Sequence, residues 1–192
     1  MHEVEQQLWG NCTNTFGEET KQLVMAKRMG LVTYHDGRSP INIDMSGKTI
    51  LDIGGGPVSL LLKCTGLQQG FIMDPGVWPE WVYERYKSAG LDYVALRGED
   101  ITDRYGMFDE IWIYNVLQHV EDPEKILTNA LALTKTIRLF EWINLPPHPG
   151  HPNELKAGVL DRILGSRGQI DWLDESGCVG LAYYGVWNYA ND

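Results

Sequence analysis

Short apolar runs alternate with longer amphipathic segments along most of the chain. A run of roughly four to eight apolar residues bounded by Gly, Asp or Pro is typical of a buried strand, whereas apolar residues three and four positions apart are typical of a helix. The runs predict strands at 48–53, 70–74, 92–96, 108–116 and 136–143. The segments between and after them predict helices at 18–29, 57–66, 79–90, 122–134 and 151–166.

Local signals mark where some of these elements begin and end. Thr15 and Glu18 have the spacing of a capping box, and Gly30 is a suitable residue to end the helix that follows. The tail at 168–187 predicts two more strands, joined by a turn at 175–177. The chain therefore ends, on this interpretation, in a β-hairpin.

The alternation predicts an α/β fold: a mainly parallel, doubly wound sheet flanked by helices, with a C-terminal antiparallel edge hairpin. A chain of 192 residues is long enough for one substantial core, so we expect a single domain over 1–192. Within it, residues 1–30 are expected to form an N-terminal lid or helix segment and residues 48–192 the core. Ligands of such sheets bind beyond the carboxyl ends of the strands, and functional residues are expected there.

The stretch "LDIGGGPVSLLL" at 51–62 places a carboxylate, Asp52, just before a glycine-rich turn. A dinucleotide-binding turn needs a third glycine where this chain has Ser59, and Asp52 would repel a pyrophosphate. S-adenosylmethionine (SAM) has a cationic ammonium and sulfonium and no phosphate, so a carboxylate beside it is favourable. The glycines also let the backbone approach a ligand closely. A tight turn without a ligand is the alternative interpretation.

Two further strand ends have acidic residues in suitable positions. Asp74 follows Asp52 by 22 residues, a spacing at which an acid can accept hydrogen bonds from both ribose hydroxyls of a nucleoside. Glu99 and Asp100 follow the third strand, where one of them can accept a hydrogen bond from the adenine amino group. The alternatives are a turn that Asp74 begins before Pro75, and a solvated acidic loop.

Four segments, "ILDIGGGP", "FIMDPG", "GEDI" and "FDEIWIYNVLQHVEDPEKIL", together resemble the class I SAM-dependent methyltransferase family over roughly residues 48–145. The resemblance implies a Rossmann-like fold, SAM as cofactor and methyl transfer as the reaction. It also implies that the loop at 115–119 passes beside the adenosine and the transferred methyl. The cofactor contacts expected from it are Trp9, Asp52, Gly54, Gly55, Gly56, Pro57, Asp74, Pro75, Glu99, Asp100, Ile101, Asn115, Val116 and Gln118.

The glycine-rich turn departs from the family pattern at one position. Many members have a third glycine where this chain has Val58, and Pro57 lacks a backbone N–H donor. We therefore expect the amino-acid end of SAM to be held differently here.

Residues that contact the methyl acceptor are expected from the N-terminal segment and from the loops after the fourth and fifth strands. The N-terminal segment resembles the lid of smaller family members, and Phe16 is expected to bind the acceptor together with Trp142 and His148. A hydroxyl or amine acceptor is helped by a general base. The predicted catalytic residues are His119, His151 and Glu141, with packing and capping roles as the alternatives.

The loop at 144–155 raises the question of a metal site, because His148, His151 and Glu154 are three residues apart. Prolines and a glycine interrupt this stretch and prevent one continuous helical face. No metal is therefore expected. The loop is predicted to shape the acceptor pocket, and a plain connection between elements is the alternative.

The overall charge narrows the class of acceptor. The formal net charge is −10 and the isoelectric point is about 4.9, which disfavours a nucleic-acid partner. The loop "NVLQ" after the fourth strand also lacks the motif of DNA amino-methylating enzymes. We expect a hydroxyl or amine of a small molecule, a sugar or a peptide side chain as acceptor, with no nucleic acid or membrane partner, and a monomer or homodimer.

The remaining features concern location and the competing functions. The cysteines form no CxxC pair, the N-terminus is polar and acidic, and no apolar run approaches the roughly 18–20 residues of a membrane helix. These features predict a cytoplasmic protein. The other functions left open are a non-catalytic SAM-binding partner subunit, another SAM-consuming chemistry, and an NAD-dependent oxidoreductase, which Asp52 and Ser59 disfavour.

Overall fold

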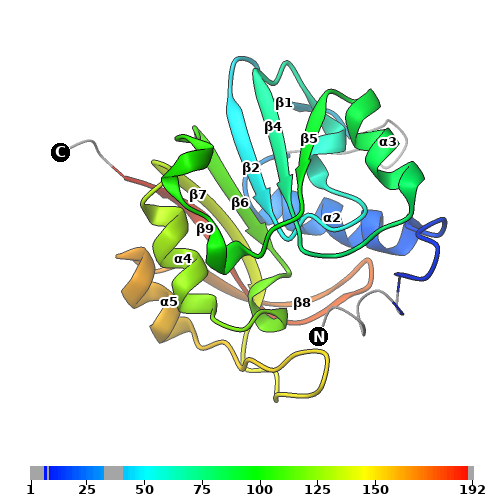
Figure 1. Ribbon diagram of the computed structural model, residues 1–192. Coiled ribbons are helices and arrows are strands. Elements are labelled where there is room, and N and C mark those ends of the chain that lie inside the picture. The colour runs from blue at the N-terminus through cyan, green and yellow to red at the C-terminus, as the bar shows by residue number, and fades with distance from the viewer. Residues whose placement is uncertain (1–6, 8, 33–40, 190–192) are drawn as a thin grey trace.

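A seven-stranded sheet forms the centre of the protein (Figure 1). The computed structural model describes residue 7, residues 9–32 and residues 41–189, so the expectations for residues 1–6 and 8 lie outside the described residues. The strands of the sheet are β2 (Thr49–Ile53), β4 (Gln69–Met73), β5 (Leu91–Val94), β6 (Glu110–Tyr114), β7 (Thr136–Trp142), β8 (Gln169–Glu175) and β9 (Cys178–Asn188). A separate two-stranded sheet pairs β1 (Ile43–Asp44) with β3 (Cys64–Thr65).

The strand order is β5-β4-β2-β6-β7-β9-β8. The pairs among β5, β4, β2, β6 and β7 are parallel, whereas β9 is antiparallel to both of its neighbours. From β2 the chain winds outward through β4 and β5, then crosses back to β6 and winds the other way. The order therefore reverses between β2 and β6, and the expected doubly wound sheet with a C-terminal antiparallel hairpin is confirmed.

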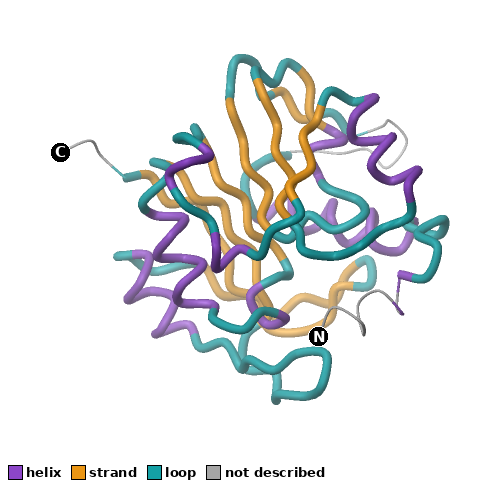
Figure 2. Tube along the Cα trace, in the orientation of Figure 1, coloured by secondary structure: helices purple, strands orange, loops and turns teal. Residues whose placement is uncertain are grey.

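The sheet is covered on both faces, as alternating side chains along a central strand require. Of two consecutive residues in β2, Ile50 packs into one buried cluster and Leu51 into the other. The first cluster includes side chains of α2 (Phe16–Arg28) and α3 (Glu80–Ser88), and the second includes those of α4 (Pro123–Leu131) and α5 (Ala157–Leu164). The arrangement of helices on either side of the sheet is visible in Figure 2.

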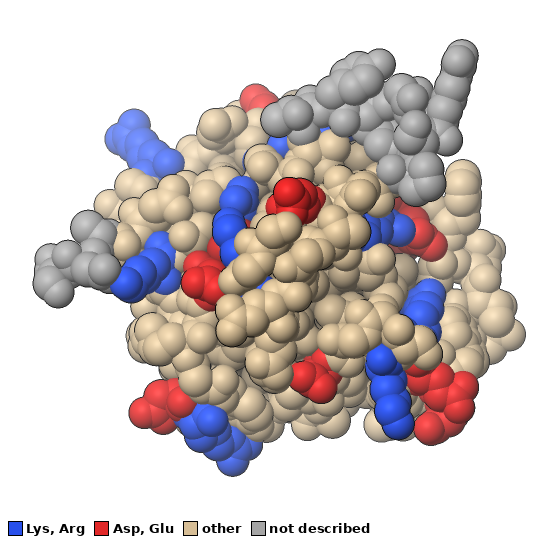
Figure 3. Space-filling view, turned by 90° about the horizontal axis from the view of Figure 1, so that it is seen from above, with Lys and Arg blue, Asp and Glu red and all other residues tan. Residues whose placement is uncertain are grey.

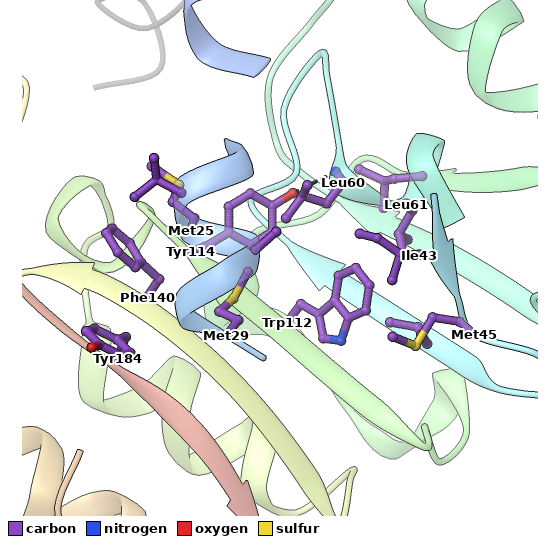
Figure 4. Close-up of a cluster of buried hydrophobic side chains, with 14 of the residues drawn as sticks. Met25, Met29, Ile43, Met45, Leu60, Leu61, Trp112, Tyr114, Phe140 and Tyr184 are labelled. Atoms are coloured by element: carbon purple, nitrogen blue, oxygen red, sulfur yellow. Dashed lines mark hydrogen bonds between the residues drawn. The ribbon is translucent and has the colours of Figure 1, made fainter. Parts of the chain in front are cut away.

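Helix α2 packs against the middle of the sheet through its apolar side. Met25 and Met29 lie close to Trp112 and Tyr114 of β6 (Figure 4). Gly30 ends the helix with a left-handed backbone, φ 67°, as expected from the sequence. The capping box does not form, because the Thr15 hydroxyl donates to the Glu19 carboxylate instead, and the helix begins at Phe16.

The prediction of a helix at 57–66 is wrong. The segment contains a single 3₁₀ turn, η1 (Leu60–Lys63), followed by the short strand β3. Pro57 lacks an N–H donor, and Ser59 is extended, with ψ 147°, while its hydroxyl accepts a hydrogen bond from the Leu61 N–H. The backbone of this segment is held by side chains from other elements, described below, and a helix does not develop.

The helix expected at 151–166 is shorter than predicted, since α5 begins only at Ala157. The residue before a proline is disfavoured in a helix, and His151 precedes Pro152. His148 and His151 instead form an isolated antiparallel bridge. The other 3₁₀ turns are η2 (Gly98–Asp100), η3 (Asp103–Tyr105) and η4 (Leu117–His119).

The surface mixes charges of both signs. Lys and Arg are interspersed with Asp and Glu on the face shown in Figure 3. Among the described residues, no helix combines the length and apolarity needed to cross a membrane.

An ion-pair network links the central strands β2, β6 and β7 near their amino-terminal ends. Glu110 is 2% exposed and accepts hydrogen bonds from Arg138 Nε at 2.6 Å, Lys48 Nζ at 2.5 Å and Trp112 Nε1 at 2.9 Å. Burial acts to raise the pKa of Glu110, but these donors lower it to about 2. Arg138 also donates to the Met29 carbonyl, so the network links the sheet to the end of α2.

We expect Glu110→Gln to lower the free energy of unfolding at pH 7 by about 2 kcal/mol, because it removes a buried charge from two basic partners. A lowered pKa in the folded chain stabilises it above the unfolded value of roughly 4.3, and this stabilisation is lost as the pH falls towards 2. Urea titrations at several pH values measure this, with Glu84→Gln on the exposed side of α3 as control. A difference from the wild type that persists near pH 2 would contradict the ion-pair explanation.

Candidate functional site

A cavity of about 620 Å³ lies at the carboxyl ends of the central strands. The segments that follow β2, β4, β6 and β7 all line it, as does the turn η2 after β5. The expected position of the site is therefore the place where the structure has its cavity. The residues expected to bind the cofactor that line it are Trp9, Gly54, Gly55, Gly56, Asp74, Pro75, Glu99, Asn115 and Val116.

The glycine-rich turn requires glycine for reasons of both backbone and space. Gly54 and Gly56 have φ values of 77° and 55°, in the left-handed region that side chains disfavour. A Cβ atom on Gly54 would lie 2.4 Å from Val116 Cγ2, and one on Gly55 would lie 2.8 Å from Asp52 Oδ2. The turn is thus pressed between the loop after β6 and the Asp52 carboxyl beneath it.

Two tyrosine hydroxyls hold the segment after this turn. The Tyr86 hydroxyl donates to the Gly56 carbonyl at 2.7 Å and accepts from the Ser59 N–H at 3.0 Å. The Tyr114 hydroxyl accepts from the Leu60 N–H at 3.0 Å. These bonds give the Ser59 and Leu60 N–H groups partners on other elements, so the segment can follow an irregular path without leaving these buried backbone groups unpaired.

The position that departs from the family pattern also contacts α2. Gln22 donates from Nε2 to the Val58 carbonyl at 2.5 Å, and Arg85 donates to the Pro57 carbonyl. Val58 lines the cavity, whereas Pro57 is not among the described residues that do. The wall of the cavity thus has a valine side chain where a third glycine would leave space.

Asp52 lies beneath the turn rather than in the cavity wall. It is fully buried, and its Oδ2 accepts hydrogen bonds from the Ser59 hydroxyl at 2.5 Å and the Tyr114 hydroxyl at 2.6 Å. Burial raises the pKa of Asp52 to about 7, and the nearby Asp74 adds to the rise. Its contacts in this structure are to protein groups, and its contact with a cofactor stays a prediction.

Asp74 lies in the cavity wall and fixes the adjacent backbone. Its Oδ2 accepts from the Gly56 N–H at 3.1 Å and its Oδ1 from the Gly76 N–H at 2.7 Å. The carboxylate therefore joins the turn after β2 to the segment after β4. Its bond to a ribose stays a prediction, and its carboxylate lies beside the glycine-rich turn.

The two acids after β5 have different surroundings. Glu99 is 5% exposed, lines the cavity, and accepts from the backbone N–H groups of Glu121 and Asp122 at 2.9 and 3.2 Å. Asp100 is exposed and pairs with Arg97 Nε at 3.0 Å. Ile101 is buried in the core cluster under α4. Of the two acids, Glu99 is the one positioned towards the cavity.

The loop after β6 is held from below by Glu141 of β7. This fully buried carboxylate accepts from the Val116 N–H at 2.9 Å and the Leu117 N–H at 3.0 Å. Burial raises the pKa of Glu141 to about 7, although these N–H groups act to lower it. Gln118 is buried and donates to Asn115 Oδ1 at 2.8 Å. Neither Glu141 nor Gln118 is among the described residues that line the cavity. Their hydrogen bonds instead hold the loop after β6 in place.

Three imidazoles lie close together, with the ring of His151 near those of both His119 and His148. The rings of His119 and His151 both line the cavity, with centroids 4.2 Å apart and planes nearly perpendicular. The ring centroid of His148 lies 4.3 Å from that of His151, and His148 is exposed. No group of three His, Cys, Asp or Glu side chains within 7, 9–32 and 41–189 is arranged to hold a metal ion.

The N-terminal and C-terminal elements complete the wall. Trp9, Trp142 and Val179 line the cavity, whereas Phe16 is 80% exposed and is not among the described lining residues. Phe16 lies at the first position of α2, and its expected contact with the acceptor stays a prediction that its exposure does not favour. The same holds for the exposed His148.

Sequence reasoning missed several residues of the wall. Gln22 and Trp78 both line the cavity, and their buried Oε1 and Nε1 atoms have no hydrogen-bond partner among the described residues. Such atoms are costly to bury unless a ligand or water satisfies them. Gln22 had a recognisable signal, because it occupies the apolar stripe of α2 together with Met25 and Met29. The other lining residues not expected from the sequence include Glu18, Lys21, Met25 and Arg97.

The raised pKa of Asp52 predicts a pH effect on stability. Between pH 4 and pH 7, roughly, the unfolded chain releases a proton that the folded chain retains, so the free energy of unfolding falls as the pH rises. The slope from one such group is at most about 1.4 kcal/mol per pH unit. We expect Asp52→Asn to remove this part of the slope in denaturant titrations, and the exposed Asp103→Asn to leave it unchanged. An identical slope in Asp52→Asn and the wild type would show that the carboxyl ionises normally.

Comparison with known proteins identifies the fold. No protein-family model matches the chain, and no curated protein matches it in sequence. In structure it is similar to magnesium protoporphyrin IX methyltransferase (ChlM) from Synechocystis PCC 6803 with bound SAM, at TM-score 0.62 and 13% identity over 98% of this chain and 90% of that one.

Two further solved structures have the same architecture. The first is the 1,6-didemethyltoxoflavin-N1-methyltransferase of Burkholderia thailandensis with bound 1,6-didemethyltoxoflavin and S-adenosylhomocysteine, at TM-score 0.60 and 15% identity over 99% of this chain and 90% of that one. The second is the N-terminal domain of EvdMO1 with S-adenosylhomocysteine (SAH) bound, at TM-score 0.53 and 19% identity over 76% of each chain. The protein therefore has the Rossmann-like fold of class I SAM-dependent methyltransferases.

Proposed function

We propose that the protein transfers a methyl group from SAM to a hydroxyl or amine of a small molecule, a sugar or a peptide side chain, acting as one methyltransferase domain. The observation that supports this most is the cavity of about 620 Å³ at the carboxyl ends of β2, β4 and β6. One part of its wall has the glycine-rich turn and acids suited to a nucleoside with a cationic tail, and another part has imidazoles and apolar side chains.

The charges of the wall favour SAM over a dinucleotide. The described lining residues include four carboxylates, Glu18, Asp74, Glu99 and Glu121, and two basic side chains, Lys21 and Arg97. Both basic groups are paired, Lys21 with Glu18 at 3.3 Å and Arg97 with Asp100 and Glu121 at 3.0 and 2.7 Å. A wall with this balance attracts a ligand with a sulfonium and an ammonium and repels a pyrophosphate.

The described residues fit such a cofactor. Asp74 would accept from the ribose hydroxyls and Glu99 from the adenine amino group, with the backbone of the turn at Gly56 against the ligand. The unsatisfied Gln22 Oε1 and Trp78 Nε1 offer one acceptor and one donor for its polar atoms. When bound, SAM supplies an electrophilic methyl group on a good leaving group.

The acceptor side of the cavity explains how the chain would promote the reaction. Trp142, Leu145 and Val179 provide apolar surface that can orient an acceptor and exclude water. His119 and His151 also line the cavity, with ring centroids 4.2 Å apart, and an imidazole can accept a proton near neutral pH. A non-catalytic SAM-binding subunit would not need this second half, which is why we favour an enzyme.

Cofactor binding is tested by titration calorimetry with SAM and with NAD. We expect micromolar-range binding of SAM and no measurable binding of NAD. In Asp74→Asn the affinity for SAM should fall about tenfold or more, because a charge-assisted hydrogen bond is worth roughly 1.5–3 kcal/mol. Asp103→Asn is the matched control and should bind SAM like the wild type, since Asp103 is exposed and is not among the described residues that line the cavity. A preference for NAD would overturn the proposed function.

Turnover is tested by incubating the protein with methyl-labelled SAM and a cell extract. We expect the label on a small molecule, a sugar or a protein side chain, and His119→Ala or His151→Ala should lower its transfer by roughly 10²–10⁴-fold while SAM binding is kept. If SAM binds but its labelled methyl group is transferred to no molecule of any extract, the result overturns the proposed methyl transfer and favours a SAM-binding subunit.

A further inference from the structure

The loop between β7 and α5 contains a small turn that points a carbonyl group at the active-site histidine. The backbone N–H of His148 donates to the His151 carbonyl at 2.9 Å, and the N–H of His151 donates to the His148 carbonyl at 2.8 Å. Pro149 and Gly150 form the tip of this turn. The Gly150 carbonyl oxygen lies 2.9 Å from Nδ1 of His119.

This contact determines which nitrogen of His119 can accept a proton. A carbonyl oxygen only accepts hydrogen bonds, so Nδ1 must carry the hydrogen. In the neutral ring the basic nitrogen is then Nε2, which lies 3.4 Å from the amide nitrogen of Gln118, a group that can only donate to it. A neutral imidazole in water mainly carries its hydrogen on Nε2, so the protein selects the less common tautomer.

Asn153 joins the small turn to the segment that contains His119. Its side-chain Nδ2 donates to the Val120 carbonyl at 2.6 Å and to the Leu117 carbonyl at 3.3 Å. Its backbone N–H donates to the Gln118 carbonyl at 3.3 Å. The three bonds lie on either side of His119 in the sequence, and the side chain that makes two of them is half-buried.

A second support holds the same segment from the sheet. Glu141 binds the N–H groups of Val116 and Leu117, as described above. The backbone around His119 is therefore fixed from β7 on one side and from Asn153 on the other. With both loops tied together, the Gly150 carbonyl stays within hydrogen-bonding distance of the imidazole.

We infer that Asn153 is a positioning residue that keeps His119 in the Nδ1–H tautomer, with Nε2 as the atom that receives the proton of the acceptor. This inference rests on the proposed function. As Nε2 takes the acceptor proton, the acceptor lone pair forms the bond to the methyl carbon, and the carbon–sulfur bonding pair remains on sulfur. Asn153 touches neither reactant, and its effect passes through the loop to Gly150 and His119.

The wild-type protein tests the tautomer directly. Nitrogen-15 NMR of histidine-labelled protein above pH 8, with SAH present, distinguishes Nδ1–H from Nε2–H, and the spectrum of His119→Gln identifies the His119 signals. We expect His119 as Nδ1–H. A His119 ring observed as Nε2–H overturns the inference, whatever the variants do.

Variants of Asn153 test the positioning role. We expect both Asn153→Ala and Asn153→Asp to convert a large fraction of His119 to Nε2–H, to lower methyl transfer at least tenfold, and to keep the SAM dissociation constant within twofold. The matched control is Asn188→Ala, which also removes one asparagine hydrogen bond, with Thr136, at the opposite end of the sheet. It should change none of these quantities.

The outcomes separate the inference from the proposed function. Asn153 variants that keep His119 as Nδ1–H overturn the positioning role even if the protein methylates an acceptor. A protein with the Nδ1–H ring that fails to bind SAM overturns the proposed function, while the tautomer assignment stands.

Discussion

The hydrogen bonds of the buried Asp52 carboxyl are the contacts on which the site depends. They join the end of β2 to Tyr114 at the end of β6 and to Ser59 beyond the glycine-rich turn. These are the strands between which the order of the sheet reverses. Tyr114 in turn holds the Leu60 N–H, so one cluster fixes the path of the segment that replaces a helix. The shape of the cavity floor follows from this polar cluster in an otherwise apolar interior.

The strands of the large sheet and its mainly parallel, doubly wound arrangement could be predicted from the sequence, because they depend on local apolar runs and on the rule that parallel strands are connected through helices. The segment at 57–66 could not, although Leu60, Leu61 and Leu62 read as the start of a helix. Its backbone is satisfied by Tyr86 and Tyr114, 27 and 54 residues away from their partners in sequence. No local pattern reveals a hydrogen bond across that separation.

For the site, the sequence showed which residues lie at strand ends, but it did not show which way their side chains point. Asp74, Glu99 and Asn115 line the cavity as their positions suggested. Asp52 and Glu141 occupy equally suitable positions, yet their carboxyls point beneath the backbone and bind the loops that form the wall. Whether an acid faces the ligand or supports the loop depends on the alternation within its strand and on packing from other elements. Gln22 and Trp78 belong to the wall for the same reason, since the tertiary fold brings them there.

The antiparallel strand β9 has a consequence for how the protein is made. Gly177 and Val179, at the tip and the start of the last strand, line the same cavity as Trp9 and Lys21 near the other end of the chain. The tip lies against α2, where Arg28 pairs with Glu175 at 3.0 Å. During synthesis on a ribosome, this part of the wall emerges after all the other described residues that line the cavity. A nascent chain can therefore build the parallel strands and the glycine-rich turn early, but it encloses its cavity only when the hairpin folds back onto the first helix.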